Sequence, residues 1–232
     1  MSITVKTISA DEHLAFVAAR GQASFLQLPA WGKAKPEWRS ESVGFFDGDT
    51  LTGVGLVLYR QLPKLPRYLA YLPEGPVLDW NRPDVDAHLE ALVAHARRNK
   101  AFAVRIGPTV VHHRWLAPTV KAAIADPEIT ALSQATPDET TLVGTRVLRT
   151  LDHLGWQPQA EGHGFAAGQP KFNYQLHLTD AEGTPLTDEQ LLKGMNQLWR
   201  RNIKKADKLG VTVTRGERAD LARFHHIYLE TA

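Results

Sequence analysis

Apolar and polar positions along the first sixty residues predict a helix followed by a pair of strands. The stretch "SADEHLAFVAAR", residues 9–20, opens with a Ser cap and two acids and then carries apolar side chains at helical spacing. Two strand-like runs follow, "SESVGFFDG" and "TLTGVGLVLYRQL", and they meet at Asp47-Gly48-Asp49. Since Asp-Gly is a strong turn signal between apolar runs, we predict a β-hairpin there.

The next forty residues predict a strand, a helix and a second strand. "RYLAYLPEGPVLDW" reads as a strand broken by Pro73, Gly75 and Pro76, and "RPDVDAHLEALVAHARRNK" has apolar residues at helical spacing. "AFAVRIGP" is a short apolar run that Pro108 ends, as expected for a buried strand. This order favours a mixed α/β sheet flanked by helices over a helical bundle.

The pattern then becomes less regular before two more elements appear. Residues 126–141 are polar and predict a loop, and a helix is expected over roughly residues 141–154, with Gly155 closing it. Residues 156–170 are rich in Gly and Pro, which is typical of a domain boundary or a long loop. The strict alternation in "KFNYQLHL" predicts a half-buried strand.

Near the end of the chain, the pattern predicts one long amphipathic helix. Thr187 and Gln190 form a T-x-x-Q capping box, and Gly210 closes the helix. Between them Leu192, Met195, Trp199 and Ile203 recur at spacings typical of a helix. We expect this apolar stripe to face a core.

Composition indicates a globular protein with one unusually charged segment. The chain has 232 residues, 43% of them hydrophobic, no cysteine and a net charge of +2. Residues 187–215 hold seven cations and three acids, so this segment carries more positive charge than the whole chain. No signal peptide or transmembrane segment is expected, and the absence of thiols fits a reducing cytoplasm.

The predicted basic helix therefore contains cations that repel one another. Arg200 with Lys204, Arg201 with Lys205, and Lys204 with Lys208 are like-charge pairs four residues apart, and together they cost the helix about 1 kcal/mol. A bound anion would offset this cost, because Arg grips phosphate oxygens with a planar fork and Lys adds charge. A diphosphate and an RNA backbone are both suitable anions; a merely solvated face is the alternative.

Other constellations of residues give weaker signals. The chain has ten histidines, but neither His112-His113 nor His225-His226 has the spacing of a zinc site, so no metal is expected. Trp31 and Trp38 flank two lysines, Lys33 and Lys35, and could form a binding lip or belong to the core. The motifs of hydrolases, of P-loop proteins and of dinucleotide-binding proteins are absent.

Several of these stretches occur together in one family. "SFLQLPAWGKAK", the hairpin, "YLAYLPEGPVLDW" and "RRNIKKADKLGVTV" follow each other in this order. In this, the chain resembles the Fem (FemABX) peptidyltransferases, which use aminoacyl-tRNA to build peptidoglycan cross-bridges. The resemblance implies a first domain similar to GNAT acyltransferases over residues 1–165 and the start of a second such domain over residues 166–232. Because members of the family are longer, we expect this second domain to be truncated.

The resemblance also implies a substrate, a reaction and a set of binding residues. The acceptor would be UDP-MurNAc-pentapeptide or its lipid-linked form, and aminoacyl-tRNA would be the donor, with no other cofactor. Lys35 and Arg201 match the residues that hold the diphosphate, and Lys33, Arg200, Lys204 and Lys205 would add positive charge beside them. The reaction would be aminolysis of the activated ester in the cytoplasm or at the inner face of the membrane. We assign no catalytic residue, since Gly107 stands where relatives often have an acid.

Three alternative functions follow from the same features. An acetyl-CoA-dependent GNAT enzyme would need a glycine-rich pyrophosphate loop, which the sequence lacks. A non-catalytic RNA-binding module would need exposed aromatic rings among the cations, and Trp199 is predicted to lie on the apolar stripe instead. A relative that aminoacylates lipid head groups is the third alternative, and the missing membrane segment counts against it.

Overall fold

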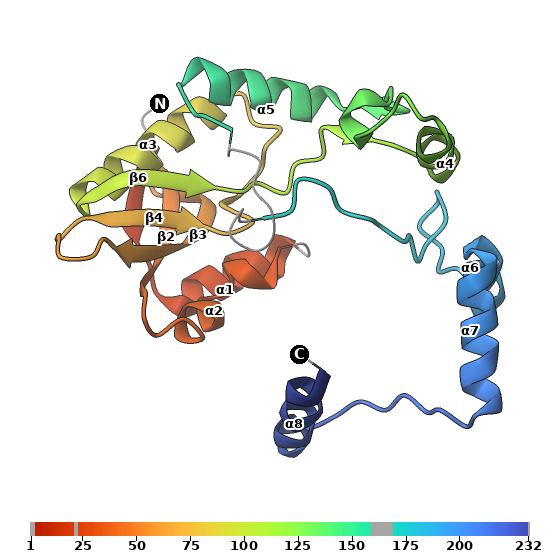
Figure 1. Cartoon of the computed structure of the whole chain (residues 1–232). Coiled ribbons are helices and arrows are strands. Elements are labelled where there is room, and N and C mark those ends of the chain that lie inside the picture. The colour runs from red at the N-terminus through yellow and green to blue at the C-terminus, as the bar shows by residue number, and fades with distance from the viewer. Residues whose placement is uncertain (1–2, 21–22, 159–168, 232) are drawn as a thin grey trace. The chain divides into compact units, whose positions relative to one another are not determined.

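The computed structural model describes residues 3–20, 23–158 and 169–231 (Figure 1). These residues belong to two compact units, residues 1–171 and residues 172–232. The domain boundary predicted between residues 165 and 166 lies outside the described residues, so it stays a prediction. A β-sheet with its surrounding helices makes up the first unit, whereas the second consists of helices joined by extended segments.

A mixed β-sheet forms the centre of the first unit. Five strands run in the order β1-β2-β3-β4-β6, and β5 pairs with β3. Strands β1 to β4 are antiparallel neighbours, while β4 and β6 are parallel because the chain crosses over through a helix between them. The mixed α/β class that the sequence predicts is confirmed. The strands are β1 (Ile3–Thr7), β2 (Arg39–Asp47), β3 (Thr50–Gln61), β4 (Tyr68–Leu72), β5 (Val77–Leu78) and β6 (Ala101–Ile106).

Strands β2 and β3 form the predicted hairpin. Asp47 pairs with Thr50, and Gly48 adopts a φ of 59° in the turn between them, a conformation that glycine adopts without strain. Farther along β3, Gly53 lets β5 approach closely, because a Cβ added at Gly53 would lie 2.2 Å from Cδ2 of Leu78. The close approach of β5 therefore explains the glycine inside this strand.

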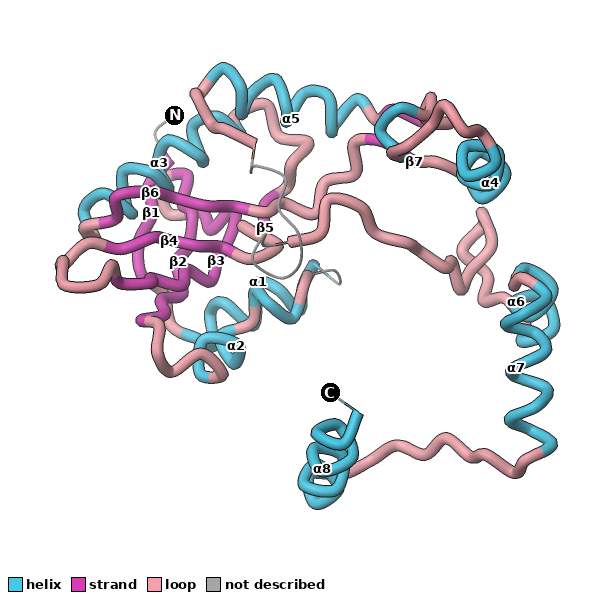
Figure 2. Tube along the Cα trace, in the orientation of Figure 1, coloured by secondary structure: helices cyan, strands magenta, loops and turns pink. Residues whose placement is uncertain are grey.

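Helices cover both faces of the sheet (Figures 1 and 2). Helices α1 (Ala10–Arg20) and α2 (Pro29–Lys33) lie on one face, and α3 (Val85–Arg98) lies on the other with α5 (Leu142–His153) beside it. Helices α1, α3 and α5 confirm the three helices predicted in this half of the chain. The core between the sheet and α3 contains the buried residues Val43, Phe45, Val57, Tyr59, Ala70, Leu72, Leu92 and Ala96.

A small accessory region precedes α5. It contains α4 (Ala117–Ala125), a short 3-10 helix (Leu132–Gln134) and a two-stranded sheet of β7 (His113–Arg114) and β8 (Glu139–Thr140). Another short 3-10 helix, Phe25–Gln27, lies elsewhere in the unit. The predicted loop over residues 126–141 thus includes β8. Asp138 joins the region together, since its carboxylate accepts hydrogen bonds from Leu116 N (2.7 Å) and Thr119 Oγ1 (2.8 Å).

Two predicted strands differ from the structure. Strand β6 is half-buried and not fully buried, and the side chain of Phe102 is 53% exposed, because β6 lies at the edge of the sheet. The strand predicted over residues 171–178 does not form, and the exposed fractions of Tyr174 and Leu178 are 90% and 62%. Alternation stabilises a strand only beside a partner, and the described residues provide just one isolated bridge there, from Thr179 to Pro185.

The second unit contains α6 (Asp188–Gly194), α7 (Gln197–Lys208), a 3-10 helix (Arg218–Asp220) and α8 (Leu221–Thr231). The prediction of one continuous helix from Thr187 to Gly210 is wrong, because Met195 and Asn196 have extended backbones between α6 and α7. Asn196 caps α7, as its side-chain oxygen accepts a 2.9 Å hydrogen bond from Trp199 N. The predicted Thr187–Gln190 capping box is present at the start of α6.

Candidate anion-binding site

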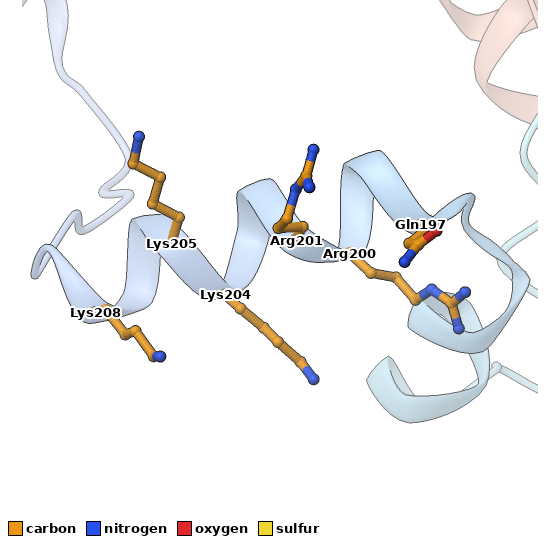
Figure 3. Close-up of a pocket in the computed structure, with 6 residues that line it drawn as sticks. All are labelled: Gln197, Arg200, Arg201, Lys204, Lys205 and Lys208. Carbon is orange, nitrogen blue, oxygen red and sulfur yellow. The ribbon is translucent and has the colours of Figure 1, made fainter.

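Five cations on α7 surround an open groove of about 630 Å³ (Figure 3). Arg200, Lys204 and Lys208 follow one another at every fourth residue and project to one side, whereas Arg201 and Lys205 project to the other. Gln197, at the start of the helix, completes the lining. Because every lining residue comes from α7, the groove is formed by the side chains of one helix and is open to solvent.

The electrostatics of this groove favour an anion. Within the described part of the chain, no carboxylate lies within 4.0 Å of any of these five cations. Lys205 and Lys208 lie in the last turn, where the helix dipole favours positive charge, but Arg200 and Arg201 lie near the N-terminal end, where it does not. The arrangement therefore places two guanidinium groups where folding alone gains nothing from them.

The apolar side of α7 differs from its prediction. The side chains of Leu198 and Trp199 are 54% and 62% exposed, and no residue of α6 or α7 is buried among the described residues. Ile203 and Ala206 are half-buried on the same side. The expectation that Trp199 lies in a core is therefore wrong for the described chain.

In the first unit, Lys35 is held against an aromatic ring. Its Nζ lies 5.4 Å from the centre of the Trp31 ring, and Phe25 meets the same ring edge-on at 5.5 Å. Lys35 is half-buried, whereas Lys33, in the last turn of α2, is exposed. The sequence left open whether Trp31 and Trp38 belong to the core or form a binding lip. Both side chains are half-buried, so neither description fits fully.

Gln27, a residue that the sequence did not single out, anchors the segment that carries Lys35. Its side chain is fully buried, donates a 2.6 Å hydrogen bond to Pro73 O and accepts a 2.9 Å hydrogen bond from Leu56 N. Leu56 lies on β3 between the residues that pair with β5 and those that pair with β4. The Gln27 amide therefore replaces a strand in this gap. No local pattern in the sequence indicates this role, because its partners Pro73 and Leu56 lie 46 and 29 residues away.

The predicted site residues fall into two groups. Lys33 and Lys35 belong to the first unit, and Arg200, Arg201, Lys204 and Lys205 belong to α7 in the second. The structure brings the four α7 cations together in one groove and adds Lys208 to them. A site that Lys35 shares with Arg201 stays a prediction.

A buried polar network on the α3 side of the sheet was also not predicted. Glu41 accepts hydrogen bonds from Thr7, from Tyr59 (2.9 Å) and from His95 (3.2 Å). Burial alone would raise the pKa of Glu41, but the hydrogen bonds and the charge of His95 outweigh burial and lower this pKa to about 2. Burial and the neighbouring Glu41 raise the pKa of Tyr59. Because Glu41 and His95 are 54 residues apart, local sequence patterns carry no signal for the pair.

Each of the two histidine pairs makes contacts of its own. His113 shares a hydrogen bond with Thr140 (3.0 Å), and its ring lies 3.6 Å from that of His112. His226 Nε2 lies 3.2 Å from Glu230 on α8. Among the residues that the structure describes, no group of three His, Asp or Glu side chains could hold a metal. None of the described helices is both long enough and apolar enough to cross a bilayer.

Comparison with known protein families gives a match over nearly the whole chain. The family model described as the FemAB family matches residues 8–232. Both groups of cations therefore lie inside the matched region. The match includes the stretches on which the resemblance to the Fem peptidyltransferases was based.

Individual relatives agree with this match. The lipid II:glycine glycyltransferase of Staphylococcus saprophyticus is 28% identical over 223 residues, which are 95% of this chain and 46% of that protein. The protein of the same name from Staphylococcus aureus strain MRSA252 is 27% identical over 220 residues, 94% of this chain and 44% of that protein. The crystal structure of FemX is 25% identical and has a TM-score of 0.62, covering 95% of this chain and 47% of that one. The chain thus spans about half the length of the curated relatives it matches.

Proposed function

Because the chain belongs to the FemAB family, we propose that it takes part in aminoacyl transfer to a peptidoglycan precursor. The amino acid would come from aminoacyl-tRNA and would be added to the side-chain amine of the stem peptide. We propose UDP-MurNAc-pentapeptide or its lipid-linked form as acceptor, since the relatives described above are named for lipid II. The reaction would take place on the cytoplasmic side of the membrane and would need no cofactor besides aminoacyl-tRNA.

The observation that carries this proposal is the unpaired cationic groove on α7. A diphosphate there would offset the repulsion among the five cations, with Arg201 providing a two-pronged contact to its oxygens. Lys35 would provide the second contact, because the Trp31 ring already attracts its ammonium group and favours that position before the ligand binds. Lys33, Arg200, Lys204 and Lys205 would add positive charge around the same ligand. We also propose that residues 1–165 form a GNAT-like domain and that residues 166–232 form the start of a second one.

The proposed reaction requires positioning more than a protein nucleophile. The free amine of the stem peptide attacks the ester carbonyl of aminoacyl-tRNA, an amide bond forms, and the terminal ribose hydroxyl leaves with the proton that the amine loses. Since the ester is already activated, holding the two substrates together supplies a large part of the rate enhancement.

A second candidate function, binding of RNA without catalysis, is favoured by one observation. The ring of Trp199 is 62% exposed and directly precedes the cations Arg200 and Arg201. An exposed ring among cations is what single-stranded RNA needs for stacking and phosphate contacts. The two candidates separate on Trp199→Ala, which would weaken RNA binding in the second case and leave precursor binding unchanged in the first.

The transfer reaction can be tested directly by mass spectrometry. The chain is incubated with UDP-MurNAc-pentapeptide and a mixed aminoacyl-tRNA pool, and a mass gain of one amino-acid residue on the precursor is expected. Arg201→Ala should lose this product, whereas Arg215→Ala, which removes an exposed arginine of the same unit outside the groove, should retain it. Acetylation of a substrate from acetyl-CoA, with no aminoacyl product, would replace the proposal with an acetyltransferase function.

A further inference from the structure

A second cationic surface lies in the first unit, at the end of the sheet that appears on the left in Figure 1. Here the β3–β4 loop, the turn from α3 to β6 and the start of β2 come together. Hydrogen bonds connect all three, since Tyr68 N donates to Lys100 O (3.2 Å) and Arg39 donates to Asn99 Oδ1 (3.4 Å). Six exposed cations project from them, and we call this surface the basic end: Arg39, Lys64, Arg67, Arg97, Arg98 and Lys100.

Two of the three segments of the basic end carry no acid, and on the third, Glu37 and Glu41 lie two residues on either side of Arg39 in the sequence. Neither residues 60–73 nor residues 91–107 contain an Asp or a Glu. In the described part of the chain, no carboxylate lies within 4.0 Å of any of the six cations. Since the whole chain has a net charge of only +2, this charge is concentrated on one surface and is not a property of the chain as a whole.

Two of these cations have backbone conformations with positive φ, which favour glycine. Lys64 and Lys100 have φ angles of 65° and 63°, and only one other non-glycine residue in the described chain, Glu74, has a positive φ. Lys100 directly follows Asn99, the C-cap of α3, which is the position where glycine is most common. Glycine would fit both positions with less strain. Folding alone therefore does not explain a lysine at either of them.

An apolar side chain protrudes among these charges. Leu65 lies at the tip of the β3–β4 loop, 54% exposed, between Pro63 and Pro66. The loop is held in shape by hydrogen bonds from Leu62 N to Arg67 O (2.9 Å) and from the Gln61 side chain to Leu65 O (3.2 Å). Leu65 is thus presented outward on a fixed loop.

We propose that the basic end docks on an anionic phospholipid surface, with Leu65 reaching into the interface. Clustered Lys and Arg side chains are attracted to acidic lipid head groups, and an aliphatic tip adds apolar burial. RNA is the competing polyanion, but its recognition uses exposed aromatic rings, whereas the side chain at this tip is aliphatic. The proposal does not depend on the transfer reaction, although a surface-bound enzyme would lie close to a lipid-linked acceptor.

Vesicle flotation with the 232-residue chain tests the proposal without precursor or tRNA. Phosphatidylcholine vesicles with and without phosphatidylglycerol are compared at low salt, and binding should require the anionic lipid. The double variant Lys64→Gln/Lys100→Gln should weaken binding about 25-fold, at about fivefold for each cation that contacts the surface. The matched variant Lys6→Gln/Lys121→Gln removes two exposed lysines elsewhere in the same unit and should bind like the unsubstituted chain. Equal weakening by both variants would overturn the proposal.

Two further variants separate docking from folding and from RNA binding. Lys64→Gly/Lys100→Gly suits the backbone at both positions, so its melting temperature should not fall while its vesicle binding does. Leu65→Ser should weaken vesicle binding and leave binding of a polyuridylate probe unchanged. If the Lys64 and Lys100 variants lost affinity for polyuridylate and kept their affinity for anionic vesicles, the basic end would be an RNA-binding surface and the proposal would be wrong.

Discussion

The Gln27 side chain offers the sharpest test of how the first unit holds its candidate site. Gln27→Ala removes a fully buried amide that satisfies two backbone groups, Leu56 N and Pro73 O. Gly75 lies directly against this amide, since a Cβ added at Gly75 would lie 2.3 Å from Cδ of Gln27. The amide therefore connects three segments, and one of them leads into α2 and Lys35.

The expected loss of stability follows from these two contacts. Each buried backbone group left without a partner costs about 1–3 kcal/mol. Two such groups give about 2–6 kcal/mol, and water entering the space left by the side chain would move the value toward the lower end. Because a domain of this size is stable by only about 5–15 kcal/mol, the effect is large enough to measure reliably.

Urea unfolding followed by tryptophan fluorescence measures this loss. Gln61→Ala is a matched control, because the Gln61 amide makes its 3.2 Å hydrogen bond to Leu65 O at an exposed position. The control should change the free energy of unfolding by less than about 0.5 kcal/mol. If Gln27→Ala proved as mild as Gln61→Ala, the amide would not be the anchor of this segment.

Three further predictions concern the first unit. The free energy of unfolding should fall by about 3 kcal/mol as pH drops from about 4.5 to about 2, because the pKa of Glu41 is about 2 in the folded chain and near 4.3 in the unfolded chain. Urea titrations at several pH values should show that Glu41→Gln removes this dependence. The buried ring of His13 has its pKa lowered to about 4 by burial, so stability should also fall as pH decreases from about 6.5 toward 4, and His13→Leu should flatten the melting temperature over that range. Gly53→Ala should destabilise the fold by about 1–3 kcal/mol through its clash with Leu78, as calorimetry would show.

Local patterns in the sequence were enough to predict most of the first unit. The hairpin turn at Gly48 and the helices α1, α3 and α5 depend on neighbouring residues, and all of them form as expected. The partners of Glu41 and Gln27 lie far away in the chain, so no local pattern could indicate that these two side chains are buried and paired. The spacing of residues in the sequence shows which side chains share a face of a helix or strand, but it does not show what packs against that face.

The same limit explains the errors in the second unit. Residues 171–178 alternate like a strand, yet they form none in the described chain, because alternation says nothing about whether a partner strand is present. The apolar stripe was correctly periodic, but the Asn cap at position 196 divides it between α6 and α7. The cationic side of α7 was predicted correctly, since like charges four residues apart share a helix face wherever the helix lies.

Calorimetric titration with UDP-MurNAc-pentapeptide measures whether the cations of α7 and Lys35 bind a diphosphate-bearing precursor, as we propose. We expect saturable binding that weakens in salt, falls at least tenfold in Arg201→Ala and in Lys35→Ala, and is retained in Arg215→Ala. If both Arg201→Ala and Lys35→Ala are folded and bind the precursor as tightly as the unsubstituted chain, the proposed site is wrong.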